Sequence, residues 1–223
     1  TLFIASCGPT NHTLIDFWRM IWEYKIKCVI MLTQLTEGAK EMCKQYWPKS
    51  DGSSETFGSY KVTLEQQDKF TDYTCRHLKL KKGDEERAVI QLHMESWMDM
   101  RIMETSVGIL NLRQEMRKFI SKDCPPVLVH CRAGVGRTGT FLGLDYLLEQ
   151  SAKEGFIDVA KCVAKLRKQR VKMVQNADQY EFLYQAVTER ALLGNTCYSS
   201  SEFISKYPAI MRAEIGKASC RER

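Results

Sequence analysis

The stretch Val129–Gly139, read as VHCRAGVGRTG, joins a short apolar run to a long helix-forming segment. Gly134 and Gly136 free the backbone to curl, so that successive N–H groups can point at one centre and form an anion-binding nest. A helix that begins near Arg137 adds the positive end of its dipole to the same point. These surroundings favour the thiolate of Cys131, which is the reactive form of the side chain. The pattern therefore predicts an oxyanion site with a nucleophile beneath it.

Other side chains of this stretch suit a phosphoryl group. Arg137 offers a planar fork for two phosphoryl oxygens, and Thr138 offers a hydroxyl that would steady the sulfur when it leaves. Arg132 adds a positive charge next to Cys131, which either favours the thiolate further or displaces the loop. The residues expected to bind the phosphoryl group are Arg132, Ala133, Gly134, Val135, Gly136 and Arg137.

Two other interpretations of the string are weaker. Gly134-x-Gly136-x-x-Gly139 matches a dinucleotide-binding fingerprint. That fold needs a second strand ending in an acidic residue after the helix, whereas Gly155 and another helical segment follow here. An inert cysteine in a tight turn would leave Arg137 buried beside it without an anion, which is costly.

Composition points to one large domain. The chain has 223 residues, of which 44% are hydrophobic, and its formal net charge is +6. The longest aliphatic run, Val29–Leu32, is far too short to span a bilayer. Nine cysteines without a paired pattern, and no Cys or His cluster with metal-ligand spacing, favour a reduced cytoplasmic setting and no metal. The basic residues at 161–172 are expected to form a solvated helix face, and without interleaved aromatics they do not indicate nucleic-acid binding.

Residue periodicity predicts an α/β (α+β) fold, in which a central mixed β-sheet is flanked by helices. Strands are expected at 2–5, 27–33, 60–64, 73–80, 88–94 and 127–130, and helices at 16–24, 106–121, 138–150, 158–170 and 178–193. In the first helix, Phe17, Met20, Ile21 and Tyr24 are expected to share one face.

Several segments carry a family resemblance. The stretch Val129–Gly139 resembles the signature of the protein tyrosine phosphatases, which reads His-Cys, five residues, Arg, Ser or Thr, Gly. Residues 16–22, 45–48 and 166–170 are also similar to family segments, and Cys7 stands before Gly-Pro where the family has Gln. The resemblance covers nearly all of residues 1–194. It implies the highly twisted sheet of these phosphatases and a reaction that needs neither metal nor organic cofactor.

The resemblance also implies further site residues. The segment SWMDM is similar to the family's Trp-Pro-Asp loop, so Asp99 is implied to act as general acid and then as general base. Met98 replaces the family's proline, and the open loop would then lose more entropy on closing. Gln175 and Gln179 are implied to position the attacking water.

The histidines are expected to have structural roles. His130, beside the nucleophile, is expected to organise the loop by hydrogen bonds and not to transfer a proton. His12, His77 and His93 lack a partner pattern and are expected to be ordinary surface or sheet residues.

The resemblance divides the chain into three expected parts. Residues 1–194 would be a phosphatase catalytic domain without its N-terminal phosphotyrosine-recognition segment. Residues 195–213 would be a linker like the one that follows the first phosphatase domain of receptor-type members. Residues 214–223 would be a non-native tail, because Ile215–Arg223 resembles a translated sequencing adapter.

The expected function is that of a receptor-type protein tyrosine phosphatase, which hydrolyses phosphotyrosine in proteins through a phosphocysteine. Such a domain would lie in the cytoplasm, with contact to a membrane only through a receptor portion outside this sequence. Its partners would be phosphotyrosine-containing proteins, without nucleic acid or metal. The alternative is a weak or inactive pseudophosphatase that binds phosphotyrosine proteins. A dual-specificity phosphatase would accept phosphoserine equally, and the long N-terminal resemblance argues against it.

Overall fold

A computed structural model describes residues 2–97, 105–120, 124–194, 201–205 and 208. They fall into two compact units, residues 1–188 and residues 189–223. In the second unit, residues 189–193 end a helix and residues 201–205 are helical. The first unit holds the elements from which the site is built.

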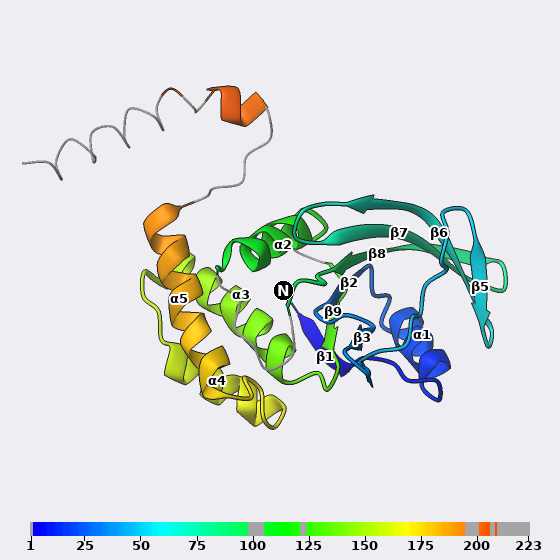
Figure 1. The fold of residues 1–223 in the computed structure, drawn as a ribbon, viewed down its shortest axis with the longest axis horizontal. Coiled ribbons are helices and arrows are strands. Elements are labelled where there is room, and N and C mark those ends of the chain that lie inside the picture. Colours follow the sequence, from blue (N-terminus) through cyan, green and yellow to red (C-terminus); the bar gives the residue numbers. More distant parts are fainter. Residues whose placement is uncertain (1, 98–104, 121–123, 195–200, 206–207, 209–223) are drawn as a thin grey trace, which may run out of the picture. The chain divides into compact units, whose positions relative to one another are not determined.

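The first unit is built on a seven-stranded mixed sheet with helices on both faces (Figure 1). The strands are β1 (Phe3–Cys7), β2 (Cys28–Met31), β3 (Thr36–Glu37), β4 (Lys40–Glu41), β5 (Ser54–Phe57), β6 (Tyr60–Lys69), β7 (Thr74–Lys82), β8 (Glu85–His93) and β9 (Val127–Cys131). The order across the sheet is β1-β9-β2-β8-β7-β6-β5, and β3 pairs with β4 separately. From β1 to β8 the neighbours are parallel, and from β8 to β5 they are antiparallel. The prediction of a central mixed sheet flanked by helices is therefore confirmed.

Five helices cover this sheet. They are α1 (Leu14–Glu23), α2 (Val107–Lys118), α3 (Gly136–Glu154), α4 (Val159–Gln169) and α5 (Ala177–Leu193). Figure 1 shows α3 and α4 on one side of the sheet and α1 on the other. In the part of the chain that the structure describes, no helix is both long and apolar enough to cross a membrane.

The sheet separates two apolar cores, and β2 contributes to both. Cys28 and Ile30 pack with the helices α2 to α5, whereas Val29 and Met31 pack with α1 and Tyr46. Side chains alternate between the faces of a strand, so a continuous apolar run is typical of a strand covered on both sides. Central parallel strands of this kind give the site a rigid base.

The first helix differs from its prediction at its C-terminal end. Tyr24, expected on the same face as the buried Phe17 and Ile21, is more than half exposed, whereas Trp18 is fully buried. The helix ends at Glu23, and Lys25 has φ +54°, so Tyr24 no longer follows the helical periodicity. Trp18 is held in place by donating its indole N–H to the carbonyl of Tyr46 at 3.1 Å.

The antiparallel strands are longer than predicted, and β5 was not predicted. β5 is largely exposed and polar, so it lacks the apolar alternation that indicates a strand. It pairs with β6 through a turn at Gly58, which has φ +60°. Backbone pairing and turn geometry, which leave no apolar pattern, define this edge of the sheet.

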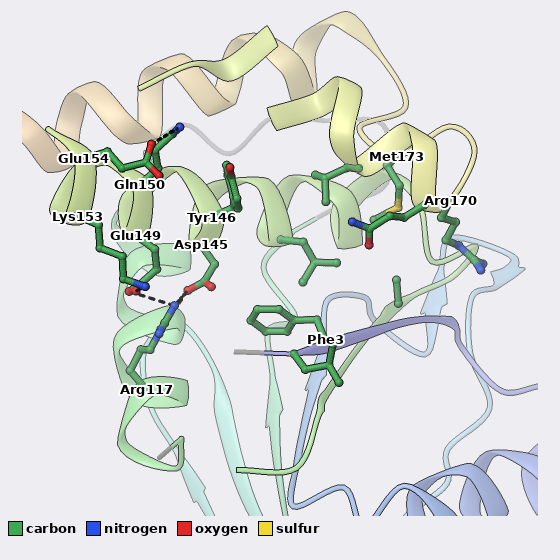
Figure 2. A pocket seen from close by; sticks show the side chains of 15 residues that line it. Phe3, Arg117, Asp145, Tyr146, Glu149, Gln150, Lys153, Glu154, Arg170 and Met173 are labelled. Carbon is green, nitrogen blue, oxygen red and sulfur yellow. Dashed lines mark hydrogen bonds and ion pairs between the residues drawn. The ribbon is translucent and has the colours of Figure 1, made fainter. Parts of the chain in front are cut away.

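A buried carboxylate joins α2 to α3. Asp145 accepts hydrogen bonds from Nε of Arg113 at 2.8 Å and from Nε of Arg117 at 3.1 Å. The Asp145 side chain is 4% exposed, while the neighbouring Glu149 is 36% exposed and pairs with the same arginines. Figure 2 shows Arg117, Asp145 and Glu149 together on one wall of a pocket. Because both arginines of α2 donate to the buried carboxylate of Asp145, this residue is the main polar link between α2 and α3.

An Asp145→Asn variant should lose about 3 kcal/mol of unfolding free energy, because two partly buried guanidinium groups would lose their buried counter-charge and keep only the more exposed Glu149. A Glu149→Gln control should lose at most about 1 kcal/mol, because its pairs are solvent-screened. Urea unfolding of both variants measures the difference. Equal losses would show that Asp145 does not anchor the two helices.

Candidate active site

Cys131 is the last residue of β9, an inner strand of the sheet. β9 lies between β1 and β2, parallel to both, and Cys131 is aligned with Cys7 of β1. Cys131 is 4% exposed and ends the strand, and α3 begins five residues later at Gly136. The segment between strand and helix is therefore placed where the carboxyl ends of parallel strands meet a helix N-terminus. We call residues 132–136 the anion loop.

At the start of the anion loop, the carbonyl groups face protein donors. The carbonyl oxygen of Arg132 accepts the N–H of Gly8 at 3.1 Å. The carbonyl oxygen of Cys131 lies 3.3 Å from Nδ1 of His130. Both carbonyls are thus held toward the protein, away from the inside of the loop.

In the middle and at the end of the anion loop the same pattern continues. Nε of Arg170 donates to the carbonyl of Gly134 at 3.0 Å, and its Nη2 donates to the carbonyl of Ala133 at 3.3 Å. The carbonyl of Val135 accepts the N–H of Val174 at 3.1 Å. Protein donors therefore hold the carbonyls of residues 131 to 135 in sequence.

This arrangement directs the amides. Because a trans peptide is planar, a carbonyl held on one side places the following N–H on the other side. Within the described residues, the amides of 132 to 135 donate to no other backbone group. Gly134 has φ +68°, and a Cβ there would lie 2.1 Å from the carbonyl oxygen of Ser6. The loop is thus a row of unpartnered amides that can bind an anion.

Acceptors from distant segments of the chain hold Arg137 beside the loop. It is 2% exposed, and its Nη1 donates to Oε1 of Glu37 at 2.8 Å and to the carbonyl of Trp97 at 2.7 Å. Glu37 comes from β3, far from the loop in sequence. A carboxylate and a carbonyl on one nitrogen fix the plane of the guanidinium.

The two predicted glutamines lie against the anion loop. A Cβ on Gly136 would come 2.8 Å from Nε2 of Gln179 and 3.2 Å from Oε1 of Gln175. The N–H of Gln175 donates to Oε1 of Gln179 at 2.8 Å, and Oδ1 of Asn176 accepts the N–H of Gln179 at 2.9 Å. The second bond has the form of an N-cap that positions the start of α5. The sequence segments around 136 and 175–179 therefore meet in space.

The remaining predicted residues have different positions. Thr138 is fully buried, and its Oγ1 has no hydrogen-bond partner in the described part of the chain. The side chain of Arg132 is exposed. Asp99 and Met98 lie outside the described residues.

Two histidines near the nucleophile are buried and neutral. Burial lowers the pKa of His130 to about 3 and that of His93 to about 4. Nε2 of His130 lies 2.8 Å from the hydroxyl of Tyr46. His93, for which no pattern in the sequence indicated a role, is fully buried, and its Nε2 lies 2.8 Å from the carbonyl oxygen of Thr33.

Most of the basic residues at 161–172 are exposed, as expected, but two of the arginines also bind backbone carbonyls. Arg170 holds the carbonyls of the anion loop, as described above. Arg167 donates from Nη2 to the carbonyl of Val174 at 2.7 Å and from Nε to that of Met173 at 3.0 Å. The planar arginine fork suits such paired carbonyl contacts. Lys168, which lies between the two arginines in sequence, is exposed. The feature of the sequence that could have indicated these carbonyl contacts is the presence of arginine, and not only of positive charge, at positions 167 and 170.

The pocket in Figure 2 is separate from the anion loop. It has a volume of about 610 Å³ and is lined by residues of β1, α2, α3 and α4, and none of residues 131–137 lines it. Arg170 lies at the opposite end of this pocket from Arg117, with its guanidinium turned away from the pocket (Figure 2). Arg170 thus faces the loop, and the pocket lies behind it.

An Arg170→Met variant should bind inorganic vanadate at least tenfold more weakly, because two charge-assisted bonds that hold the loop carbonyls are lost. A Lys168→Met variant changes an exposed position in the last turn of α4, just before Arg170, and should bind normally. Isothermal titration calorimetry measures both affinities. Unchanged vanadate binding by the Arg170 variant would contradict the account of the loop.

Acid should destabilise the fold through the buried histidines. Their pKa values are about 3 and about 4 in the folded state and about 6.5 in the unfolded chain, so the unfolded chain binds more protons in that window. Stability is therefore lost as the pH falls below about 6.5, by on the order of 2 kcal/mol per histidine at about pH 5. Urea unfolding of a His93→Gln variant should show a smaller loss, whereas His12→Gln should resemble the parent. Equal pH dependence in all three proteins would overturn the assignment.

Comparison with known proteins agrees with this geometry. A family model described as "Protein-tyrosine phosphatase" matches residues 1–189. The chain is 40% identical over 199 residues to receptor-type tyrosine-protein phosphatase epsilon of Rattus norvegicus, covering 87% of this chain and 28% of the relative. It is 38% identical over 203 residues to receptor-type tyrosine-protein phosphatase C of Homo sapiens, covering 90% and 16%. It is 34% identical over 214 residues to receptor-type tyrosine-protein phosphatase U of Gallus gallus, covering 95% and 15%.

The chain thus spans less than a third of the length of these curated relatives. The family match covers most of the chain, including the anion loop, Arg137 and both glutamines. With the parallel strand, the inward amides and the buried cysteine, it excludes the dinucleotide-binding interpretation. The chain therefore belongs to the protein-tyrosine phosphatase family.

Proposed function

We propose that this domain hydrolyses phosphotyrosine in proteins through a phosphocysteine intermediate. The single observation that carries the proposal is the set of outward-held carbonyls, which leaves the amides of the anion loop available above the buried Cys131. A phosphoryl group in transfer spreads its charge over three oxygens, and a row of fixed donors stabilises that charge.

In the first step, the sulfur of Cys131 attacks phosphorus while the bond from phosphorus to the tyrosyl oxygen breaks. The amides of the anion loop and the guanidinium of Arg137 hold the transferred oxygens. The departing oxygen takes a proton from Asp99, which is left as a carboxylate. The contacts of Arg137 with Glu37 and Trp97 support this role, because they orient the guanidinium before the substrate arrives.

In the second step, water attacks the phosphocysteine and the carboxylate of Asp99 takes its proton. Phosphate leaves, and the electron pair of the sulfur–phosphorus bond returns to Cys131 as a thiolate. Gln175 and Gln179 orient the water, which is supported by their position against Gly136. Thr138 would donate its unpartnered hydroxyl to the thiolate. His130 keeps a structural role, because its ring is buried and bonded to Tyr46.

The proposed role of Asp99 rests on its neighbour. The carbonyl of Trp97 accepts a hydrogen bond from Arg137 at 2.7 Å. Asp99 follows Trp97 by two residues in the sequence. A carboxyl group is the type of side chain that can protonate a leaving group and later accept a proton from water.

We also propose that the domain acts on phosphotyrosine-containing proteins as part of a receptor. The relatives that it matches are named receptor-type phosphatases, and the chain covers a small share of each. The proposed catalytic domain is residues 1–194, followed by a linker at 195–213 and a non-native tail at 214–223. It would work on the cytoplasmic side, joined to a membrane through a receptor portion outside this sequence.

Purified protein should hydrolyse an aryl phosphate, and a Cys131→Ser variant should not. The rate should follow a bell-shaped pH profile, because the sulfur must be ionised while Asp99 is protonated. An Asp99→Asn variant should lose at least a hundredfold in kcat and also the alkaline limb of the profile. An Asp51→Asn variant, changed at an exposed turn, serves as control.

A flat profile between about pH 5 and 8 would contradict the acid assignment. A parent protein that binds phosphotyrosine peptides without hydrolysing them would establish the pseudophosphatase alternative instead.

A further inference from the structure

We propose that Arg76 is a positioning residue for the anion loop: its guanidinium sets the direction of a buried hydrogen-bond chain that ends at the carbonyl of Cys131. Arg76 lies on β7, directly opposite Gln91 of β8 in the sheet register. It is 8% exposed and stacks on Trp47, with 4.5 Å between its Cζ atom and the ring centroid. The functional part of this inference rests on the proposed function of the loop.

The chain consists of four contacts. Nη1 of Arg76 donates to Oε1 of Gln91 at 3.0 Å, and Nε2 of Gln91 donates to the hydroxyl of Tyr46 at 2.7 Å. The Tyr46 hydroxyl lies 2.8 Å from Nε2 of His130. Nδ1 of the same ring lies 3.3 Å from the carbonyl oxygen of Cys131. The path crosses from β7 to β9 over the buried face of β2, where Tyr46 packs against Met31.

The direction of each bond follows from Arg76. A guanidinium can only donate, so Gln91 must turn its oxygen toward Arg76 and its NH₂ toward Tyr46. The Tyr46 oxygen then accepts from Gln91, and two acceptors face its single proton: Nε2 of His130 at 2.8 Å and Sδ of Met31 at 3.7 Å. A thioether is the weaker acceptor and is farther away, so the proton is directed to Nε2 of His130. His130 must therefore carry its own proton on Nδ1, where it faces the carbonyl of Cys131.

Arg76 also contacts a second histidine, His93, and there it imposes the opposite tautomer. Nη1 of Arg76 lies 3.1 Å from Nδ1 of His93, which must accept. His93 then carries its proton on Nε2 and donates to the carbonyl of Thr33 at 2.8 Å. One guanidinium thus imposes the Nδ1–H form on His130 and the Nε2–H form on His93. Both rings stay neutral near pH 7, because burial lowers their pKa values to about 3 and about 4.

The consequence reaches the first amide of the anion loop. A proton on Nδ1 of His130 attracts the carbonyl of Cys131, whereas a lone pair there would repel it. Because the peptide is planar, holding that carbonyl also holds the N–H of Arg132 on the opposite side. Arg76 therefore acts on the anion loop by fixing the direction of the hydrogen bonds, without touching the substrate.

The test reverses the direction of one hydrogen bond in the chain, the bond between residue 91 and Tyr46. In a Gln91→Glu variant, one carboxylate oxygen pairs with Arg76 and the other faces Tyr46, so the tyrosine proton turns toward the carboxylate. His130 must then donate from Nε2 and lose its proton from Nδ1. The control is Gln67→Glu, because the exposed Gln67 contacts Nε of the same guanidinium at 3.3 Å but lies outside the chain.

The readout is the tautomer of each histidine, from ring-nitrogen NMR of ¹⁵N-histidine-labelled full chain. In the parent and in Gln67→Glu, His130 should be Nδ1–H and His93 should be Nε2–H. In Gln91→Glu, only His130 should switch. Aryl phosphate hydrolysis should fall by about tenfold to a hundredfold in Gln91→Glu, mainly in kcat, because the loop is displaced.

Three results would overturn the proposal: an Nε2–H form of His130 in the parent, an unchanged His130 in Gln91→Glu, or a switched His130 with unchanged kcat. The first two concern hydrogen-bond direction and are measured even if the protein proves inactive, so they are distinct from failure of the proposed function. If Gln91→Glu does not fold, Tyr46→Phe removes the same link without adding charge. His130 should then lose its fixed tautomer while His93 keeps its own, and an unchanged His130 would overturn the proposal.

Discussion

The anion loop depends on where its carbonyl groups are held. Five successive carbonyls, from residue 131 to residue 135, accept hydrogen bonds from donors outside the loop. Peptide planarity turns this into a constraint on the amides, which are left on the other side. Fixed amides need no reorganisation when charge develops on a bound oxyanion, and that is the physical basis of the proposed catalysis.

The rest of the fold supplies these donors from distant segments. Gly8 follows the edge strand β1, Arg170 follows α4, and Val174 lies in the loop before α5. A central parallel sheet brings these segments to one end of β9. Buried charges are costly unless paired, and Arg137 meets this requirement through Glu37 and Trp97. The geometry is therefore a property of the whole domain and not of the signature stretch alone.

Much of this could be predicted from the sequence because it is local. The loop, the strand before it and the helix after it all appear in Val129–Gly139, and apolar periodicity indicated most of the other elements. What could not be predicted is long-range pairing. Glu37 has no pattern that connects it with Arg137, and the contact of Arg170 with the loop depends on a turn between two helices. β5 lacked an apolar signal because Phe57 alone of its residues packs against a core, and pairing with β6 holds the rest in place.

The most direct measurement is an amide-resolved NMR titration of the full chain with inorganic phosphate. The account predicts that the largest N–H shifts fall on residues 132–136, with a smaller response at the start of α3, because those amides face the bound oxyanion. Binding of phosphate that leaves these amides unchanged, or that shifts amides in another part of the sheet, would contradict it.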